Sequence, residues 1–342
     1  MTQPNTKSRS TIKEVAELAG VAKTTVSHAI SGKRPVAPET RDRIYAAMRK
    51  LQFTPNVVAR RLAGSPSRTI ALIFPLASLS PAAVELRFIA SIGEVISQGD
   101  YTFLTLASPM VGVDDLAQIV QSGLVDGVIL MRIQFNDQRV KYLKESNVPF
   151  VMIGRTRVNK DLILVDLDGE LAIELAVKHL LELGHSHIAF ICPDDVGFGF
   201  AYRLVKGYEK SCRKHNLRLV MCPASWSDDA GYRTMQTLLA EHPDLTGLII
   251  WSDVVSVGAT SALRDSGRSI PQDMSVISFD KSDHLLMASG DLTIVDTCPE
   301  EVGAQAARML LSALRRDVLT QTQVLMPPRL IVGKSTARPP QR

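Results

Sequence analysis

The stretch IKEVAELAGVAKTTVSHAISG, residues 12–32, contains two short helical patterns joined by a tight turn. Thr11 and Glu14 form a capping-box pattern, which predicts the start of the first helix. Apolar residues then recur at helical spacing until Gly20, where the helix is expected to end. The stretch therefore predicts two short helices in close succession.

The second pattern separates apolar from polar side chains. At 3.6 residues per turn, one side carries Val26, Ala29 and Ile30. The opposite side carries Thr24, Ser27 and His28. A third helix is predicted from Pro38, which suits a first-turn position, with inward residues Ile44, Ala47, Met48 and Leu51. Three short helices with a tight turn between the first two form a helix-turn-helix unit, whose second helix fits the major groove of DNA.

Basic residues are concentrated at this end of the chain. Residues 1–64 carry 12 Lys and Arg against 4 Asp and Glu, whereas the other residues carry 27 against 31. A basic head on a mildly acidic body indicates contact with a polyanion at one end only. Together with the helix pattern, the charge points to double-stranded DNA.

The chain has 342 residues, 45% hydrophobic and 22% charged, which suggests a globular protein of two or three domains. No apolar run approaches the roughly 18 residues that span a bilayer, and no secretory signal is recognisable. We therefore expect a cytoplasmic protein without a membrane partner. The four cysteines lack CxxC spacing, which favours free thiols over disulfides or a zinc site.

The segment TIKEVAELAGVAKTTVSHAISGKRPVAPETRDRI, residues 11–44, closely resembles the DNA-binding head of the LacI/GalR family of bacterial transcription regulators. The resemblance resumes at PNVVARRLAG, residues 55–64, which is similar to the hinge helix of that family, and continues more loosely to residue 335. It implies a homodimer that binds a palindromic operator, and a body that binds a small effector, usually a sugar or a nucleobase-like metabolite.

The resemblance also assigns DNA contacts position by position. Base-edge contacts fall on Lys23, Thr24 and His28, which would decide the operator sequence. Phosphate contacts fall on Ser27, Ser31, Lys33 and Arg34. Contacts of the hinge segment fall on Asn56, Arg60 and Leu62. The hinge is too short to be stable alone, so the resemblance implies that it folds on DNA, with Leu62 wedged between base pairs in the minor groove. A plain interdomain linker is the alternative.

Two residues depart from the family pattern. Ala22 and Ala37 stand where the family commonly has serine, at the starts of the second and third helices. Alanine cannot accept a hydrogen bond from the first backbone N–H groups, so each helix is expected to lose about 1 kcal/mol of capping. Ala22 also forgoes a hydroxyl contact to phosphate. DNA binding should survive both changes.

From Thr69 onward, β-branched runs alternate with amphipathic segments, which is typical of βα units and a parallel sheet. Strands are predicted at residues 69–75, 101–107, 125–131, 148–154, 187–193, 218–223, 247–252 and 275–280. Helices between them include residues 173–183 and 305–314. Eight or more strands exceed one comfortable sheet, so we expect two similar lobes whose strand ends face a ligand cleft.

The predicted fold class is therefore α/β: a three-helix head and hinge helix, followed by a two-lobed body that resembles periplasmic binding proteins, with parallel sheets. The domains implied are a head at 1–55, a hinge helix and linker at 56–67, a body at 68–334 and a tail at 335–342. Within the body, the resemblance implies one lobe of about 68–166 plus 297–324 and another of 167–296 plus 325–334.

The effector site is also predicted by resemblance. Trp226 matches the aromatic residue that stacks on the effector, Asp280 matches an acidic residue that takes hydroxyls or an amine, and Ser252 matches a polar contact. Arg203 precedes the next Gly-aromatic pair by four residues where the family has three, which leaves open whether it reaches the cleft. Arg132 and Arg155 follow strand ends and are candidates for the opposing lobe.

Enzymatic patterns are weak. His185 and His187 lack a third metal ligand and favour capping and packing roles. The GFGF segment, residues 197–200, lacks the GxGxxG order of a dinucleotide site. No nucleophile elbow, zinc-protease pattern or kinase signature is found. We expect no catalytic residues, metal or cofactor.

The sequence thus predicts a sequence-specific DNA-binding regulator, with repression favoured, whose operator affinity is controlled by a small effector bound between the lobes. A sugar or sugar derivative is the favoured effector. The alternatives are a solute-binding protein of sugar transport and a regulator that responds to a nucleobase-like metabolite. The tail ARPPQR offers no heptad, which favours a dimer over a tetramer.

Overall fold

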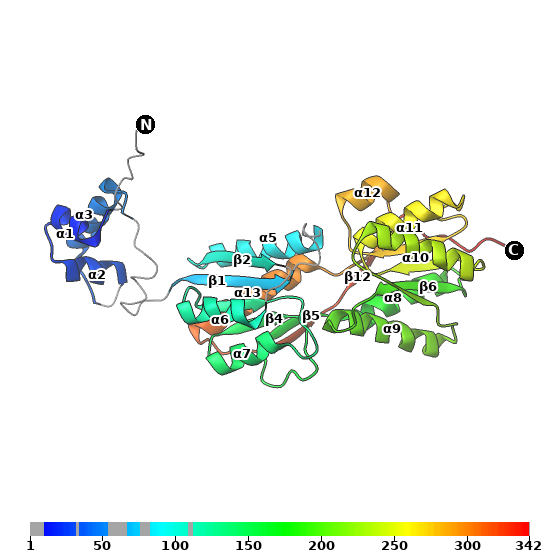
Figure 1. The fold of residues 1–342 in the computed structure, drawn as a ribbon, viewed down its shortest axis with the longest axis horizontal. Coiled ribbons are helices and arrows are strands. Elements are labelled where there is room, and N and C mark those ends of the chain that lie inside the picture. The colour runs from blue at the N-terminus through cyan, green and yellow to red at the C-terminus, as the bar shows by residue number, and fades with distance from the viewer. Residues whose placement is uncertain (1–9, 32–33, 54–66, 76–82, 109–111, 342) are drawn as a thin grey trace, which may run out of the picture. The chain divides into compact units, whose positions relative to one another are not determined.

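The computed structural model describes residues 10–31, 34–53, 67–75, 83–108 and 112–341 (Figure 1). Three helices form the head, and two sheets flanked by helices form the body. This arrangement confirms the predicted fold class. The predicted hinge helix lies outside the described residues.

The head consists of α1 (Ile12–Ala19), α2 (Lys23–Ser31) and α3 (Pro38–Lys50). The predicted capping box is present, because the backbone N of Glu14 donates to Thr11 Oγ1 at 3.4 Å and the backbone N of Thr11 donates to Glu14 Oε2 at 2.6 Å. α1 ends at Gly20, whose φ of +63° lies in the left-handed region that favours glycine. The apolar sides of the three helices share one small core, formed by Val15, Ala16, Ala19, Val26, Ala29, Ile44 and Ala47.

The start of α3 confirms the missing cap. Ala37 is the N-cap residue and makes no side-chain hydrogen bond to the helix. Pro38 at the first helical position has no N–H group, so the start of α3 has one unpaired donor fewer.

The body contains two six-stranded sheets. The first has the order β11-β5-β4-β3-β1-β2, with β1 (Thr69–Pro75), β2 (Thr102–Ser108), β3 (Gly127–Leu130), β4 (Phe150–Ile153), β5 (Leu164–Leu167) and β11 (Gln323–Met326). The second has the order β12-β10-β9-β8-β6-β7, with β6 (Ile188–Pro193), β7 (Met221–Ala224), β8 (Gly247–Ile250), β9 (Ser275–Phe279), β10 (Thr293–Asp296) and β12 (Arg329–Ile331). We call the parts built on these sheets lobe 1 and lobe 2.

Strand pairing in lobe 2 is parallel except between β10 and β12, which run antiparallel. The eight strands predicted from the sequence are present. β5, β10, β11 and β12 were not predicted as strands.

The helices of lobe 1 are α5 (Ala83–Ser97), α6 (Val113–Ser122), α7 (Gln138–Ser146) and α13 (Pro299–Arg315). The helices of lobe 2 are α8 (Gly169–Glu182), α9 (Gly199–His215), α10 (Asp228–Glu241), α11 (Asp253–Asp265) and α12 (Asp283–Ser289). α8 and α13 begin earlier than predicted, because Asp168 caps α8 and Pro299 stands in the first turn of α13. Among the helices of the described part of the chain, none is long and apolar enough to cross a membrane.

The chain passes between the two sheets three times: after β5, after β10 and after β11. α13 follows β10 of lobe 2 and packs on β3, β4 and β5 of lobe 1. Each lobe is therefore assembled from segments that are distant in the sequence, and residues near the three crossings lie between the lobes.

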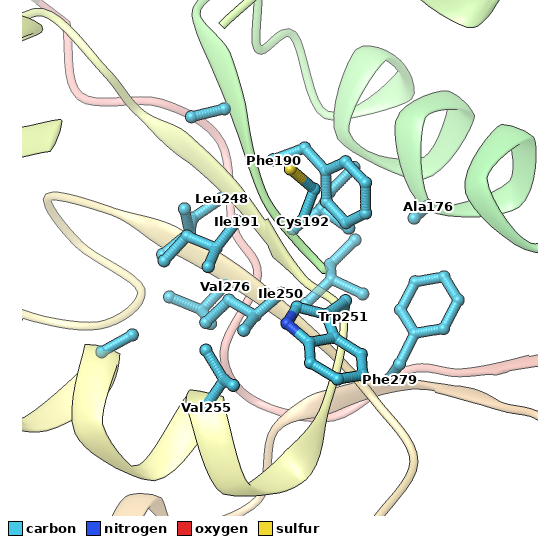
Figure 2. Close-up of a cluster of buried hydrophobic side chains, with 14 of the residues drawn as sticks. Ala176, Phe190, Ile191, Cys192, Leu248, Ile250, Trp251, Val255, Val276 and Phe279 are labelled. Carbon is cyan, nitrogen blue, oxygen red and sulfur yellow. The ribbon is translucent and has the colours of Figure 1, made fainter. Parts of the chain in front are cut away.

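The core of lobe 2 lies between its sheet and the surrounding helices (Figure 2). Phe190 and Ile191 of β6, Ile250 of β8 and Val276 of β9 are fully buried, as expected for a parallel sheet covered on both faces. Trp251 and Phe279 stand at the ends of β8 and β9, where this core meets the cleft.

α10 and α11 cross at two glycines. A Cβ atom on Gly258 would overlap the carbonyl oxygen of Asp228, and one on Gly231 would overlap the carbonyl oxygen of Val255. Backbone therefore touches backbone at this crossing. The crossing fixes the first turns of both helices, which follow Trp226 and Ser252 in the sequence.

Candidate functional site

The candidate DNA-binding surface is the polar side of α2. Val26 is fully buried, whereas Lys23 and Thr24 are exposed and Ser27 and His28 are half-buried. The helix thus presents its polar side chains away from the head core, as the periodicity predicted. Arg34 is exposed. Lys33, Asn56, Arg60, Leu62 and the side chain of Ser31 lie outside the described part of the structure.

The candidate effector site is a cavity between the strand ends of the two lobes. Five of the six predicted effector residues line it: Arg132, Arg203, Trp226, Ser252 and Asp280. Arg203 therefore reaches the cleft. Arg155 is not among the described residues that line the cavity. Its Nε donates to Oδ2 of the lining residue Asp166 at 2.7 Å.

Arg132 links the two lobes across the cavity. Its Nη2 atom lies 2.6 Å from Glu85 Oε1 of α5, and its guanidinium carbon lies 4.1 Å from the ring centroid of Trp226. Burial lowers the pKa of Arg132, an effect that the neighbouring carboxylate of Glu85 opposes. The backbone of Arg132 has a φ of +53°, a conformation that costs energy in a non-glycine residue and often marks functional sites.

Aromatic rings form one wall of the cavity. Trp226 meets Trp251 edge to face with ring centroids 5.2 Å apart, and Phe200 stacks on Trp251 at 6.1 Å. The Nε1–H groups of both tryptophans are buried and lack an acceptor among the described residues. An unpaired buried donor is costly, so these indoles would gain from a polar ligand.

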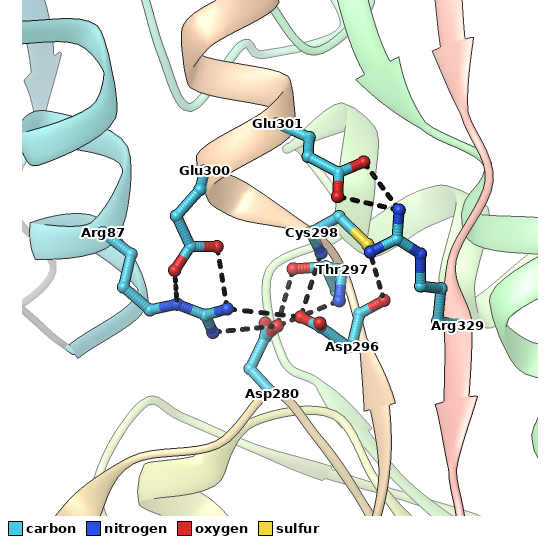
Figure 3. A network of polar contacts seen from close by, with 8 residues as sticks. All are labelled: Arg87, Asp280, Asp296, Thr297, Cys298, Glu300, Glu301 and Arg329. Atoms are coloured by element: carbon cyan, nitrogen blue, oxygen red, sulfur yellow. Dashed lines mark hydrogen bonds and ion pairs between the residues drawn. The ribbon is translucent and has the colours of Figure 1, made fainter. Parts of the chain in front are cut away.

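Asp280 belongs to a network of charges between the lobes (Figure 3). Its Oδ1 atom accepts from the backbone N of Thr297 at 3.1 Å and from Thr297 Oγ1 at 2.7 Å. Arg87 of α5 lies 4.0 Å from Asp280 and pairs with Asp296 at 3.4 Å and Glu300 at 2.5 Å. Burial raises the pKa of Asp280 to about 6, although the bonds from Thr297 oppose this shift. A group that engages Asp280 therefore acts on both lobes.

Ser252 has a structural task besides lining the cavity. Its Oγ atom accepts from the backbone N of Val255 at 3.3 Å and caps α11. The hydroxyl hydrogen stays available for a ligand, because capping uses only a lone pair of the oxygen.

Arg203 and Arg155 converge on one carboxylate. Arg203 Nη1 lies 3.9 Å from Asp166 Oδ2, the atom that accepts from Arg155. Arg203 Nη1 also donates to the carbonyl oxygen of Gly199 at 2.7 Å. Burial raises the pKa of Asp166, and the two guanidinium groups oppose this effect.

The GFGF segment joins the lobes through its backbone. The N of Gly199 donates to the carbonyl oxygen of Ile133, and the N of Phe135 donates to that of Gly197, both at 2.9 Å. A Cβ atom on Gly199 would overlap the carbonyl oxygen of Arg155. The glycine is therefore needed for the close approach of the lobes at this rim of the cavity.

The change Gly199→Ala is expected to open this rim and to break the two backbone hydrogen bonds, each worth about 1 kcal/mol. Small-angle scattering should give a larger radius of gyration, and tryptophan emission should move to longer wavelength. Gly197→Ala is the matched control, because its Cβ would approach only the movable carboxylate of Asp195. Identical scattering of Gly199→Ala and wild type would contradict the role of Gly199.

The histidine pair serves structure. His185 is buried, with Nδ1 2.9 Å from Thr246 Oγ1 and Nε2 2.8 Å from the carbonyl oxygen of Ala337. Burial lowers the pKa of His185. His187 lies on the surface, 3.4 Å from Asp244. Among the described residues no cluster of three or more His, Cys, Asp or Glu could hold a metal, and the four cysteines are free thiols.

Several cavity residues escaped sequence reasoning: Glu85, Phe88, Asp166, Phe200, Trp251 and Asp253. Trp251 and Asp253 are the sequence neighbours of the predicted Ser252. Asp166 lies where the chain was predicted to leave lobe 1. The sequence positions of these three residues could therefore have indicated that they line the cleft. Glu85 and Phe88 lie on α5, and the prediction of cleft residues considered only residues at strand ends.

A helix-turn-helix head followed in the same chain by a two-lobed body with a polar and aromatic cleft defines a class of protein: DNA-binding regulators with a ligand site. Residues 11–56 match the bacterial regulatory proteins of the lacI family, and residues 177–336 match the periplasmic binding protein-like domain. The transcriptional regulator AglR of Rhizobium meliloti (strain 1021) is 31% identical, with 97% of this chain and 95% of AglR covered. The chain belongs to the lacI family and is a DNA-binding transcriptional regulator.

Solved structures share the whole fold. The complex of the regulator CelR with cellobiose has a TM-score of 0.73 and 26% identity, covering 96% of this chain and all 100% of CelR. The lac repressor dimer bound to operator and the anti-inducer ONPF has a TM-score of 0.82 with the same coverage of both chains. At 24% identity, the lac repressor supports the fold alone.

Proposed function

We propose that the protein is a homodimeric repressor that binds a palindromic operator and changes its affinity when a small effector occupies the cleft between the lobes. The observation that carries the proposal is the exposed polar side of α2 in the same chain as a cleft lined from both lobes. The dimeric, operator-bound lac repressor supports this reading by its fold.

The DNA contacts proposed are those of the resemblance. Lys23, Thr24 and His28 read base edges, and Ser27, Ser31, Lys33 and Arg34 contact phosphates. Asn56, Arg60 and Leu62 act from the hinge in the minor groove. We keep the proposed division into a head at 1–55, a hinge and linker at 56–67, two lobes within 68–334 and a tail.

The effector proposed is a sugar or sugar derivative, held by Trp226, Ser252, Asp280, Arg203 and Arg132. An aromatic face beside carboxylates suits a sugar, because the ring takes the C–H face and the carboxylates take hydroxyls. The cellobiose complex of CelR supports this class. A nucleobase-like metabolite, which would stack on Trp226, is the second candidate. A transport protein is disfavoured, because the head has no place in solute capture.

The three passages of the chain between the lobes suggest how an effector could control DNA binding. An effector that engages Asp280 and Trp226 in lobe 2 and Arg132 in lobe 1 stabilises one relative position of the lobes. Since the hinge precedes lobe 1 in the sequence, this position sets how the two hinges of a dimer meet. The effector acts only if it binds the two positions unequally. We propose no catalytic activity, and a cytoplasmic location.

The decisive experiment selects operator sequences from a random duplex library with the purified full chain. We expect a palindromic consensus whose affinity falls steeply with salt. In the double variant Thr24→Ala, His28→Ala, affinity for the consensus should fall at least about tenfold, because each base contact is worth roughly 1–3 kcal/mol. Affinity for unrelated duplexes should change little, because phosphate contacts are retained.

Thr237→Ala, on the exposed surface of α10, is the matched control and should leave affinity unchanged. Failure to enrich any sequence, or a double variant with wild-type affinity and preference, would contradict the proposed recognition surface.

A further inference from the structure

The cavity contains more carboxylates than guanidinium groups. The lining carboxylates are Glu85, Asp166, Asp253 and Asp280, and the lining guanidinium groups are Arg132 and Arg203. Glu85, Asp166 and Asp280 each lie near an arginine, so the selectivity of the cleft depends on which charges stay unpaired.

Each guanidinium group at the cavity is already engaged by protein atoms. Arg132 lies between Glu85, 2.6 Å from its Nη2 atom, and the ring face of Trp226. Its charge is thus paired at one edge and its plane is covered. Arg203 donates to the carbonyl oxygen of Gly199 at 2.7 Å and lies 3.9 Å from Asp166. An incoming anion would therefore compete with these protein acceptors for the two guanidinium groups.

Two further arginines, which contact lining carboxylates, are engaged as well. Arg155 donates to Asp166 at 2.7 Å. Arg87 makes a bidentate pair with Glu300, at 2.5 and 2.8 Å, and lies between Asp280 and Asp296 (Figure 3). These two arginines therefore neutralise Asp166 and Asp280 of the cleft. Arg87 Nη1 is buried without a hydrogen-bond partner among the described residues, and Asp280, 4.0 Å away, is the carboxylate nearest to it in this network.

Asp253 differs from the other carboxylates. It is 2% exposed, lines the cavity and receives neither a hydrogen bond nor an ion pair from another described side chain or backbone group. A buried carboxylate needs donors, and hydroxyl groups of a ligand can supply them. A phosphate or carboxylate close to Asp253 would instead place like charges together.

We propose that the cleft selects an uncharged polyhydroxyl effector and excludes its phosphorylated and carboxylated forms. Glu85 is the specificity-determining residue, because it occupies the guanidinium of Arg132 that would otherwise receive an anion. Asp253 adds repulsion from lobe 2. This inference rests on the proposed function only in calling the ligand an effector. The selection by charge is a property of the cavity itself.

The first test needs no knowledge of the effector. The chain has two tryptophans, Trp226 and Trp251, and both line the cavity, so fluorescence quenching reports on the cleft. Quenching by iodide, caesium and acrylamide is measured and divided by the quenching of free N-acetyltryptophanamide. We expect the normalised iodide constant to be at least twofold below the caesium constant. Iodide quenching equal to or above that of caesium would overturn the proposal.

Two variants test whether Glu85 and Asp253 cause the weak quenching by iodide. Glu85→Gln releases Arg132, and Asp253→Asn removes the unpaired carboxylate, so each should raise iodide quenching while acrylamide quenching stays constant. The matched control is Glu182→Gln on the exposed surface of α8. Should Glu85→Gln fold poorly, Asp253→Asn alone decides, because it removes no partner of another side chain. Unchanged iodide quenching in the folded variants would refute the assignment.

The second test uses matched ligand pairs: glucose, cellobiose and trehalose against their 6-phosphates, and glucose against gluconate. Thermal shift and tryptophan emission should respond to an uncharged member and not to its anionic form, and Glu85→Gln should narrow that difference. Tighter binding of a phosphorylated form to the wild type would overturn the proposal. Iodide exclusion without a response to any sugar would support the charge selection and count against the sugar as effector.

Discussion

Gly258→Ala is expected to destabilise lobe 2 by about 3 kcal/mol or more, the upper range for an overpacked core. The new methyl group would overlap the carbonyl oxygen of Asp228 and lie 2.7 Å from the backbone N of Tyr232. Backbone atoms cannot rotate away as a side chain can, and both helices are also packed on the sheet. The first turns of α10 and α11 must therefore move apart.

This movement would reach the effector site. α10 begins shortly after Trp226, and α11 begins immediately after Ser252. Separation of the two helix starts should lengthen the 5.2 Å contact between Trp226 and Trp251 and change their emission. Stability and the shape of the cleft are thus coupled through one glycine.

Urea unfolding monitored by circular dichroism measures the free energy of unfolding of Gly258→Ala. Gly169→Ala is the matched control, because its Cβ would meet its nearest neighbours at an ordinary 3.5 Å. The control should be neutral or up to about 1 kcal/mol more stable through helix propensity. A loss below about 1 kcal/mol in Gly258→Ala would show that the crossing relaxes.

Asp280→Asn is expected to stabilise the ligand-free protein above pH 6. Burial raises the pKa of Asp280 from its ordinary 3.8 to about 6, so the folded state holds a proton that the unfolded state releases. The contribution of Asp280 to stability is therefore fully present below pH 4 and is lost as pH rises through 6. A pKa difference of one corresponds to about 1.36 kcal/mol, so the loss between 3.8 and about 6 approaches about 3 kcal/mol.

Asparagine removes this dependence and keeps the local geometry. Its Oδ1 atom can accept both bonds from Thr297, at 3.1 and 2.7 Å. Unfolding free energies measured from pH 4 to 8 should show the variant gaining on the wild type between pH 4 and 6 and holding that gain above. Asp317→Asn controls for loss of an exposed carboxylate. Parallel curves for Asp280→Asn and wild type would contradict the burial cost.

The cost at Asp280 has a functional meaning. Effector hydroxyls that donate to its carboxylate favour the charged form, so binding should lower its pKa and recover stability that the empty cleft lacks. The left-handed backbone of Arg132 and the unpaired indole N–H groups are further local costs at the same site. Such costs are typical of sites shaped for a ligand rather than for stability.

The head was predictable from local sequence because its signals act over a few residues. The capping box at Thr11, the turn at Gly20 and the start at Pro38 each depend on neighbours within one helical turn. Eight strands of the body were predictable as well, because each lies within an apolar or β-branched run. Trp226, Asp280 and Ser252 were found because the family pattern places them at strand ends, and the structure gathers all three around one cavity.

The sequence alone determined a helix-turn-helix head, a body of repeated βα units and the regulator family. It did not determine the short edge strands, the pairing of Arg132 with Glu85, the pairing of Arg155 with Asp166 or the arginine network around Asp280. These features join residues up to 213 positions apart, as Arg87 and Glu300 are. These residues meet only when the lobes fold and the chain passes between them. Burial and charge pairing depend on neighbours in three dimensions, which local periodicity does not encode.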